Sequence, residues 1–167
     1  ISIKTPIDSS NMHPNIWVEI AEIIETNYVN YDGFVILHGT DTMAYTASAF
    51  SFMLENLNKA VIFTGSQIPI GARRSDAKEN LITAVEIAAS GKVNEVCIYF
   101  EDQLYKANRT VKVNTEHFEA FESPNYPILA EAGVNIKYKS VLQKKQNQEL
   151  VVHKNCSDDV AILKLFP

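Results

Sequence analysis

Apolar runs and helically spaced apolar residues alternate along the first two thirds of the chain. Short, continuous apolar runs are typical of strands covered on both faces, and they predict strands at 34–37, 60–64 and 95–100, after an alternating strand at 1–7. Apolar residues at helical spacing predict helices over 14–27, 42–55 and 77–90. This order predicts an α/β fold: a Rossmann-like three-layer sandwich with a mostly parallel sheet, helices on both faces and right-handed crossovers.

Local signals mark the ends of these helices. Pro14 suits the first turn of a helix, where its missing N–H costs nothing. Asp76 and Glu79 have the spacing of a capping box, and Gly91 follows the last apolar residues of the third helix, as a C-terminal glycine does.

The second half of the chain has a weaker pattern. Residues 101–127 are polar and rich in Asn and Pro, which predicts a long, ordered loop of functional importance. A short helix is expected over 127–132 and a surface turn over 144–148. Further strands are expected at 134–138, 149–153 and 160–166. We assign residues 1–167 to a single domain.

Composition narrows the function. The net charge of −5 argues against a nucleic-acid partner, and no apolar run approaches the length of a membrane span. The two cysteines are too sparse for a disulfide framework. Cys97, within an apolar run, is expected to be a small buried hydrophobe, and a reducing compartment is favoured. The chain starts without Met, so we expect a segment of a longer protein.

Three polar turns follow predicted strands. They are Asp8-Ser9-Ser10, Thr40-Asp41-Thr42 and Gly65-Ser66-Gln67. Each one alone reads well as a helix cap or a turn. Because the carboxyl ends of parallel strands share one edge of the sheet, the three turns together predict a ligand crevice there.

Lys112 has two interpretations. On an alternating strand it is ordinarily an exposed lysine, whereas a buried lysine accepts a proton from a nearby hydroxyl. The histidines have no metal-binding spacing, so no metal is expected. The phosphate-loop, dinucleotide and GxSxG motifs do not occur in the sequence.

Four stretches resemble the L-asparaginase family, especially its type I, cytoplasmic branch: DSSNMHPNIW, HGTDTMAYTASAFSFMLENL, VIFTGSQIPIGARRSDAKENL and YKANRTVKVNTEHFEAFESPN. The resemblance covers about residues 7–136. It implies hydrolysis of L-asparagine to aspartate and ammonia, without metal or organic cofactor, in a cytoplasmic homodimer or homotetramer.

The resemblance also implies roles for individual residues. Thr40 corresponds to the family's nucleophile, Lys112 to the lysine that activates it, and Asp41 to the carboxylate that binds the substrate's α-ammonium group. Such a set fits amide hydrolysis, which needs a nucleophile, a proton shuttle and oxyanion donors.

Four further positions match the family's substrate-binding residues. Asp8 and Ser9 fall where the family grips the α-carboxylate and α-amino groups. Gly39 corresponds to the glycine that lets the backbone approach the ligand, and Ser66 to a small residue beside the substrate amide.

The chain departs from the family pattern at both ends. The N-terminal TGGT-like motif with its essential threonine, the flap tyrosine and the C-terminal domain do not occur in this sequence. We therefore expect the segment alone to be inactive. Two other functions stay open: an amidase subunit of a tRNA-dependent amidotransferase, and a non-catalytic, amino-acid-binding α/β module.

Overall fold

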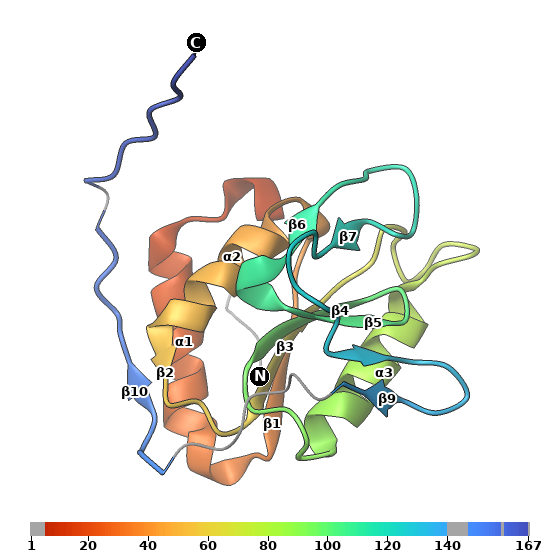
Figure 1. The fold of residues 1–167 in the computed structure, drawn as a ribbon, viewed down its shortest axis with the longest axis horizontal. Helices are drawn as coiled ribbons and strands as arrows, with labels where there is room; N and C mark the ends of the chain where they lie inside the picture. Colours follow the sequence, from red (N-terminus) through yellow and green to blue (C-terminus); the bar gives the residue numbers. More distant parts are fainter. Residues whose placement is uncertain (1–5, 140–146, 158, 167) are drawn as a thin grey trace.

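The computed structural model describes residues 6–139, 147–157 and 159–166, and it contains three α-helices that lie against a central sheet (Figure 1). All three helices that the apolar spacing predicted are present, although α2 begins two residues before the expected start and ends two residues before the expected end. The helices are α1 (Pro14–Asn27), α2 (Thr40–Met53) and α3 (Ala77–Ala89), with 3-10 turns η1 (Ser9–Asn11), η2 (Tyr28–Asn30) and η3 (Ala107–Arg109).

The central sheet has six described strands in the order β1-β3-β4-β5-β8-β9. Their bounds are β1 (Gly33–Leu37), β3 (Ala60–Thr64), β4 (Val96–Phe100), β5 (Gln103–Lys106), β8 (Ala130–Glu131) and β9 (Lys137–Tyr138). The first three are parallel, and each later strand is antiparallel to its neighbour. The core of the sheet is therefore parallel, as predicted.

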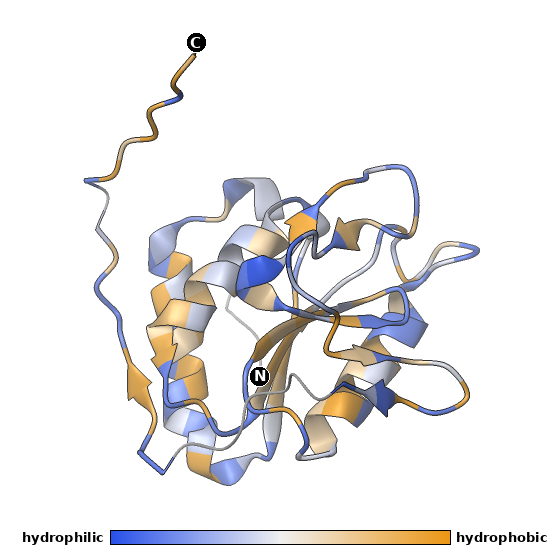
Figure 2. Cartoon of the chain, in the orientation of Figure 1, coloured by the Kyte–Doolittle hydropathy of each residue, from blue (hydrophilic) through white to orange (hydrophobic). Residues whose placement is uncertain are grey.

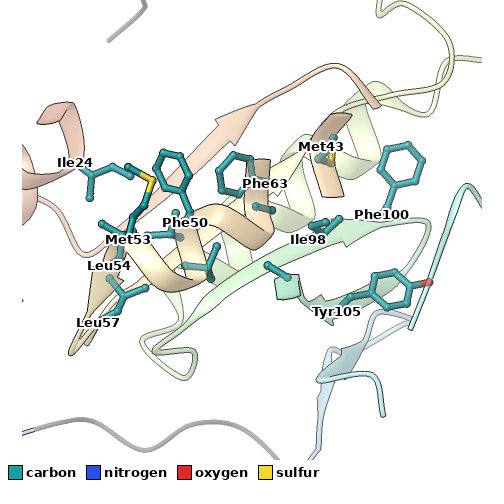
Figure 3. Close-up of a cluster of buried hydrophobic side chains, with 14 of the residues drawn as sticks. Ile24, Met43, Phe50, Met53, Leu54, Leu57, Phe63, Ile98, Phe100 and Tyr105 are labelled. Carbon is teal, nitrogen blue, oxygen red and sulfur yellow. The ribbon is translucent and has the colours of Figure 1, made fainter. Parts of the chain in front are cut away.

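Alternate residues of the strands face two different layers of helices. In β3, Val61 and Phe63 pack in one cluster with α1 and α2, whereas Ala60 and Ile62 pack in a second cluster with α3. Figure 3 shows Phe50 of α2 beside Phe63, and Figure 2 shows the apolar character of the central strands. This two-residue period places helices on both faces and confirms the three-layer α/β fold.

One of the two parallel crossovers is left-handed. The chain moves in one direction across the sheet from β1 to β3 to β4, so two right-handed crossovers would place α2 and α3 on the same face. The two helices instead pack on opposite faces. The prediction of right-handed crossovers is therefore wrong for one of them. The usual preference for right-handed crossovers is overridden here by the packing of α2 and α3 on opposite faces of the sheet.

The polar stretch 101–127 contains regular structure that its composition did not predict. β4 and β5 form a hairpin whose two turn residues, Glu101 and Asp102, both have positive φ. Two further short strands, β6 (Val111–Lys112) and β7 (Phe121–Glu122), pair antiparallel. The helix expected over 127–132 is wrong, because Ala130 pairs with Leu104 as part of β8.

The C-terminal part differs most from expectation. β10 (Val151–Val152) pairs antiparallel with β2 (Leu54–Glu55), so the strand expected over 149–153 is confirmed in shorter form. The strand expected over 160–166 is wrong: these residues are extended away from the domain and exposed, with no described strand beside them (Figure 1). Within 134–138 only β9 is a strand. Residues 1–5 and 140–146 lie outside the described residues, and with them most of the first expected strand and of the turn at 144–148.

The predicted ends of the helices are partly confirmed. Pro14 is the first residue of α1, and Gly91 has the positive φ of a C-terminal glycine. The capping box is wrong, because the Asp76 side chain does not cap α3 by accepting a hydrogen bond from a backbone N–H of its first turn. Its carboxylate instead accepts hydrogen bonds from the backbone N–H groups of Gln67 and Ile68, at 2.9 and 3.1 Å. No described helix has the length and apolarity that crossing a membrane requires.

The chain passes so close to itself at Gly65 that a side chain does not fit there. A Cβ atom on Gly65 would lie 2.3 Å from the backbone oxygen of His38. We therefore expect Gly65→Ala to lower the free energy of unfolding by about 1–3 kcal/mol, measured by urea denaturation. Gly71→Ala is the control, because nothing lies within 4 Å of a Cβ at that position. Equal stability of the two variants would contradict this packing.

Candidate active site

The three polar turns meet at the carboxyl edge of the parallel strands. The Thr42 hydroxyl donates a 2.7 Å hydrogen bond to the backbone oxygen of Ser9. A Cβ atom on Gly39 would lie 2.5 Å from the Ser9 hydroxyl, so only glycine permits this approach. His38 and Gly65 are in contact at the same edge through their backbones. The predicted convergence of these turns is confirmed.

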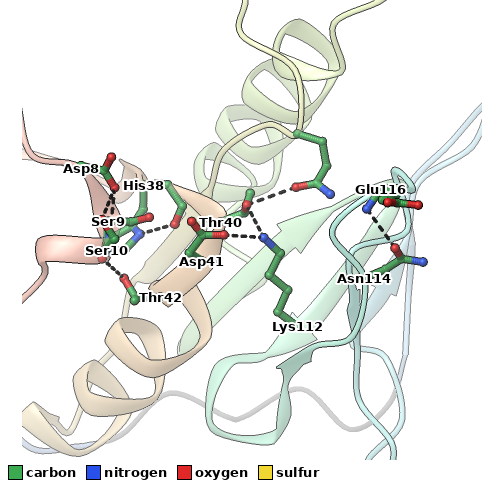
Figure 4. A network of polar contacts seen from close by, with 12 residues as sticks. Asp8, Ser9, Ser10, His38, Thr40, Asp41, Thr42, Lys112, Asn114 and Glu116 are labelled. Carbon is green, nitrogen blue, oxygen red and sulfur yellow. Dashed lines mark hydrogen bonds and ion pairs between the residues drawn. The ribbon is translucent and has the colours of Figure 1, made fainter.

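Lys112 brings the other half of the cluster from a distant part of the chain. Its ammonium nitrogen lies 2.8 Å from both the Thr40 hydroxyl and a carboxylate oxygen of Asp41 (Figure 4). Only 14% of the Lys112 side chain is exposed, against 65% for Asp41. The interpretation of Lys112 as an ordinary exposed lysine is therefore wrong. The structure joins a hydroxyl, an ammonium group and a carboxylate in one cluster.

The helix start beneath this cluster is not capped by a side chain. Gly39 is the N-cap of α2, and Thr40 and Asp41 are its first two helical residues. The reading of Thr40-Asp41-Thr42 as an ordinary cap is therefore wrong. Without a side-chain cap, the first amides of α2 point toward the edge where the cluster lies, and they favour negative charge there.

Gln67 is part of the cluster, although the family resemblance implies a binding role only for its neighbour Ser66. The Thr40 hydroxyl donates to the Gln67 side-chain oxygen at 3.1 Å, and the Gln67 side-chain nitrogen donates to the backbone oxygen of His117 at 3.0 Å. The only available sequence signal was the position of Gln67 in the third polar turn. The Asp76 carboxylate fixes the backbone of that turn by accepting hydrogen bonds from the N–H groups of Gln67 and Ile68.

The other residues expected to bind substrate, Ser9, Ser66 and Asp8, differ in their burial and in their contacts. Ser9 is buried beside Gly39, and Ser66 is half-buried directly after Gly65. Asp8 caps η1, where its carboxylate accepts from the Ser10 N–H at 2.9 Å and the Ser10 hydroxyl at 2.8 Å. These hydrogen bonds lower the pKa of Asp8. The described residues include no group of three His, Cys, Asp or Glu side chains arranged to bind a metal ion.

A buried histidine supports the cluster from within the core. The His38 ring nitrogen Nδ1 lies 2.7 Å from the Gly39 oxygen, an acceptor, so Nδ1 carries the hydrogen. Burial lowers the pKa of His38, so the ring is neutral and Nε2 accepts from the Thr46 hydroxyl at 3.0 Å. Thr46 in turn accepts from the Trp17 indole at 3.0 Å. This chain fixes the carbonyl immediately before Thr40.

Comparison with known proteins agrees with this architecture. The model of the family "Asparaginase, N-terminal" matches residues 2–144. L-asparaginase 1 of Escherichia coli K12 is 50% identical over 98% of this chain and 49% of the relative. The 60 kDa lysophospholipase of Mus musculus is 48% identical over 96% of this chain and 29% of the relative. The crystal structure of L-asparaginase I from Vibrio cholerae superposes with a TM-score of 0.86 at 50% identity, covering 90% of this chain and 46% of that one.

Fold and site together define an α/β domain with a threonine–lysine–aspartate cluster at the carboxyl edge of its sheet. The chain belongs to the asparaginase family, and the family's N-terminal model accounts for residues 2–144. The two bacterial matches confirm the resemblance to the type I branch. The chain spans about half the length of these two relatives.

The His38 chain predicts a dependence of stability on pH. The ordinary histidine pKa is 6.5, and burial lowers it in the folded state. The contribution of the neutral His38 ring to the free energy of unfolding is therefore fully present above pH 6.5. It is lost as the pH falls from 6.5 toward the pKa of the folded state, because over that range the unfolded chain binds one more proton than the folded chain. In full-length protein, His38→Asn should reduce the slope of unfolding free energy against pH between 5 and 7 by at most about 1.4 kcal/mol per pH unit.

The matched control for this measurement is His117→Asn, because the His117 ring is exposed and only its backbone oxygen contacts the cluster. Urea unfolding at several pH values gives the slopes. If His38→Asn and His117→Asn change the slope equally, the buried neutral ring is not the source of the dependence.

Proposed function

We propose that the full-length protein hydrolyses L-asparagine to aspartate and ammonia with Thr40 as the nucleophile. The observation that carries this proposal is the contact of the Thr40 hydroxyl with Lys112, which in turn contacts Asp41. The L-asparaginases of E. coli and V. cholerae, each 50% identical to this chain, support the choice of substrate.

The reaction uses each member of the cluster. Thr40 Oγ1 forms a bond to the carbon of the substrate's carboxamide, and its proton passes to Lys112. The C–N bond then breaks, and Lys112 passes this proton to the leaving nitrogen, which departs as ammonia. Water then hydrolyses the ester that joins Thr40 to the substrate's acyl group. Negative charge that develops on the carbonyl oxygen requires donors in place, and the uncapped amides of α2 lie at this edge.

Substrate binding prepares Lys112 for this role. In the free site, the ammonium group of Lys112 donates to Thr40 and pairs with Asp41, so it cannot accept a proton. The substrate's α-ammonium group binds the largely exposed Asp41. The substrate's α-ammonium group then competes with Lys112 for the same carboxylate. Ser9, Gly39 and Asp8 then receive the substrate's backbone groups, and Ser66 borders its amide.

The alternatives identified from the sequence are less well supported. A non-catalytic binding module has no need of a lysine directed at a threonine hydroxyl. An amidase subunit acting with tRNA would share the chemistry and would differ by a requirement for tRNA. We propose a cytoplasmic location and a homodimer or homotetramer, as the family resemblance implies.

Substitution of the cluster tests the proposed chemistry. In full-length protein, Thr40→Ala should lower kcat by at least about 10³-fold because the nucleophile is lost. Lys112→Met should lower kcat by about 10²- to 10⁴-fold because the proton shuttle is lost. Ammonia release from L-asparagine, without tRNA, is the measurement. Lys78→Met is the control, since Lys78 is exposed on α3.

Near-normal turnover by Lys112→Met would refute the assigned shuttle. Turnover only in the presence of tRNA would support the amidotransferase alternative. Full turnover by Thr40→Ala would exclude the threonine nucleophile.

A further inference from the structure

The orientation of the Gln67 carboxamide is fixed by its two partners. The backbone oxygen of His117 is only an acceptor, so the atom 3.0 Å from it is the donating nitrogen of Gln67. The side-chain oxygen therefore faces the Thr40 hydroxyl at 3.1 Å. A carboxamide oxygen is only an acceptor, so the hydroxyl hydrogen of Thr40 points at Gln67.

In this arrangement the hydroxyl hydrogen of Thr40 is directed at Gln67 and not at Lys112, the proposed base. Lys112 approaches the same hydroxyl oxygen at 2.8 Å as a donor. A carboxamide oxygen is too weak a base to take the proton of an attacking hydroxyl, whereas a neutral amine can. The bond to Gln67 must therefore break before the hydroxyl can turn its hydrogen toward Lys112.

Gln67 also occupies the approach that a substrate needs. A reacting carboxamide carbon must come within about 3–3.5 Å of the attacking oxygen. The oxygen of Gln67 already lies 3.1 Å from Thr40 Oγ1, and its carboxamide has the same donor and acceptor groups as the side chain of asparagine. The free site is thus occupied by a chemical equivalent of the group that it is proposed to cleave.

The backbone of the turn that carries Gln67 is anchored independently of the Gln67 side chain. Asp76 accepts from the backbone N–H groups of Gln67 and Ile68, and Asn80 donates to Asp76 at 3.1 Å and to the Gly65 oxygen at 3.0 Å. Asp76 and Asn80 are both buried. Rotation of the Gln67 side chain therefore leaves the turn in place while it breaks both carboxamide bonds.

We infer that Gln67 gates the site: its carboxamide holds the Thr40 hydroxyl unreactive until the substrate's own carboxamide displaces it. This inference rests on the proposed function. It makes Gln67 a positioning residue that opposes ligand binding in the free protein. Its removal should therefore favour the ligand.

The test compares Gln67→Ala with wild type in the full-length protein, with L-aspartate as the calorimetric ligand and L-asparagine as the substrate. Without the two competing hydrogen bonds, Gln67→Ala should bind L-aspartate about 5- to 10-fold more tightly. The KM for L-asparagine should fall similarly. Gln148→Ala, an exposed glutamine, is the control and should match wild type.

Unchanged or weaker L-aspartate binding by Gln67→Ala would overturn the gate, and so would a lower kcat with unchanged KM. A wild-type crystal structure with bound L-aspartate is independent of the variant: Gln67 should lie beyond hydrogen-bond distance of Thr40, and persistence near 3 Å would also overturn the gate. A wild-type protein that neither binds L-aspartate nor releases ammonia would refute the proposed function itself.

Discussion

The close approach of backbones at the carboxyl edge of the sheet is the constraint on which the site depends. Gly65 packs against the His38 carbonyl and Gly39 against Ser9, at distances that exclude any Cβ atom. The His38 N–H continues the ladder by donating to Thr64 at 2.9 Å. This hydrogen bond ties the segment after β1 to the segment after β3. The start of α2 at Thr40 is therefore held at a fixed position beside the other polar turns.

Two buried polar groups convert this packing into chemistry. Asp76 gives up the usual capping position and instead anchors the turn that carries Gln67. His38 remains neutral in the core and fixes the carbonyl before Thr40. Each side chain makes a hydrogen bond to a backbone group beside the cluster, so both hold the backbone that positions the reacting side chains.

The parts of the fold that are governed by local pattern could be predicted from the sequence. The buried strands and three helices follow from apolar periodicity, and the meeting of the polar turns follows from parallel strands. The β4–β5 hairpin could not be predicted, because its turn residues Glu101 and Asp102 lack the glycine or asparagine that usually marks positive φ. Neither the left-handed crossover nor the strand at Ala130 has a local cause, since both depend on distant partners.

The site shows the same division at the level of single residues. Thr40 and Asp41 are visible in the sequence because a strand end and a helix start surround them, but Lys112 meets them only through a short strand pair within a polar stretch. Gln67 is the least visible, because a glutamine in a turn has no distinctive pattern. Its importance follows from hydrogen-bond direction alone. The Thr40 hydroxyl has one hydrogen, and Thr40 is unreactive while that hydrogen is donated to Gln67 and can react once it is directed at Lys112.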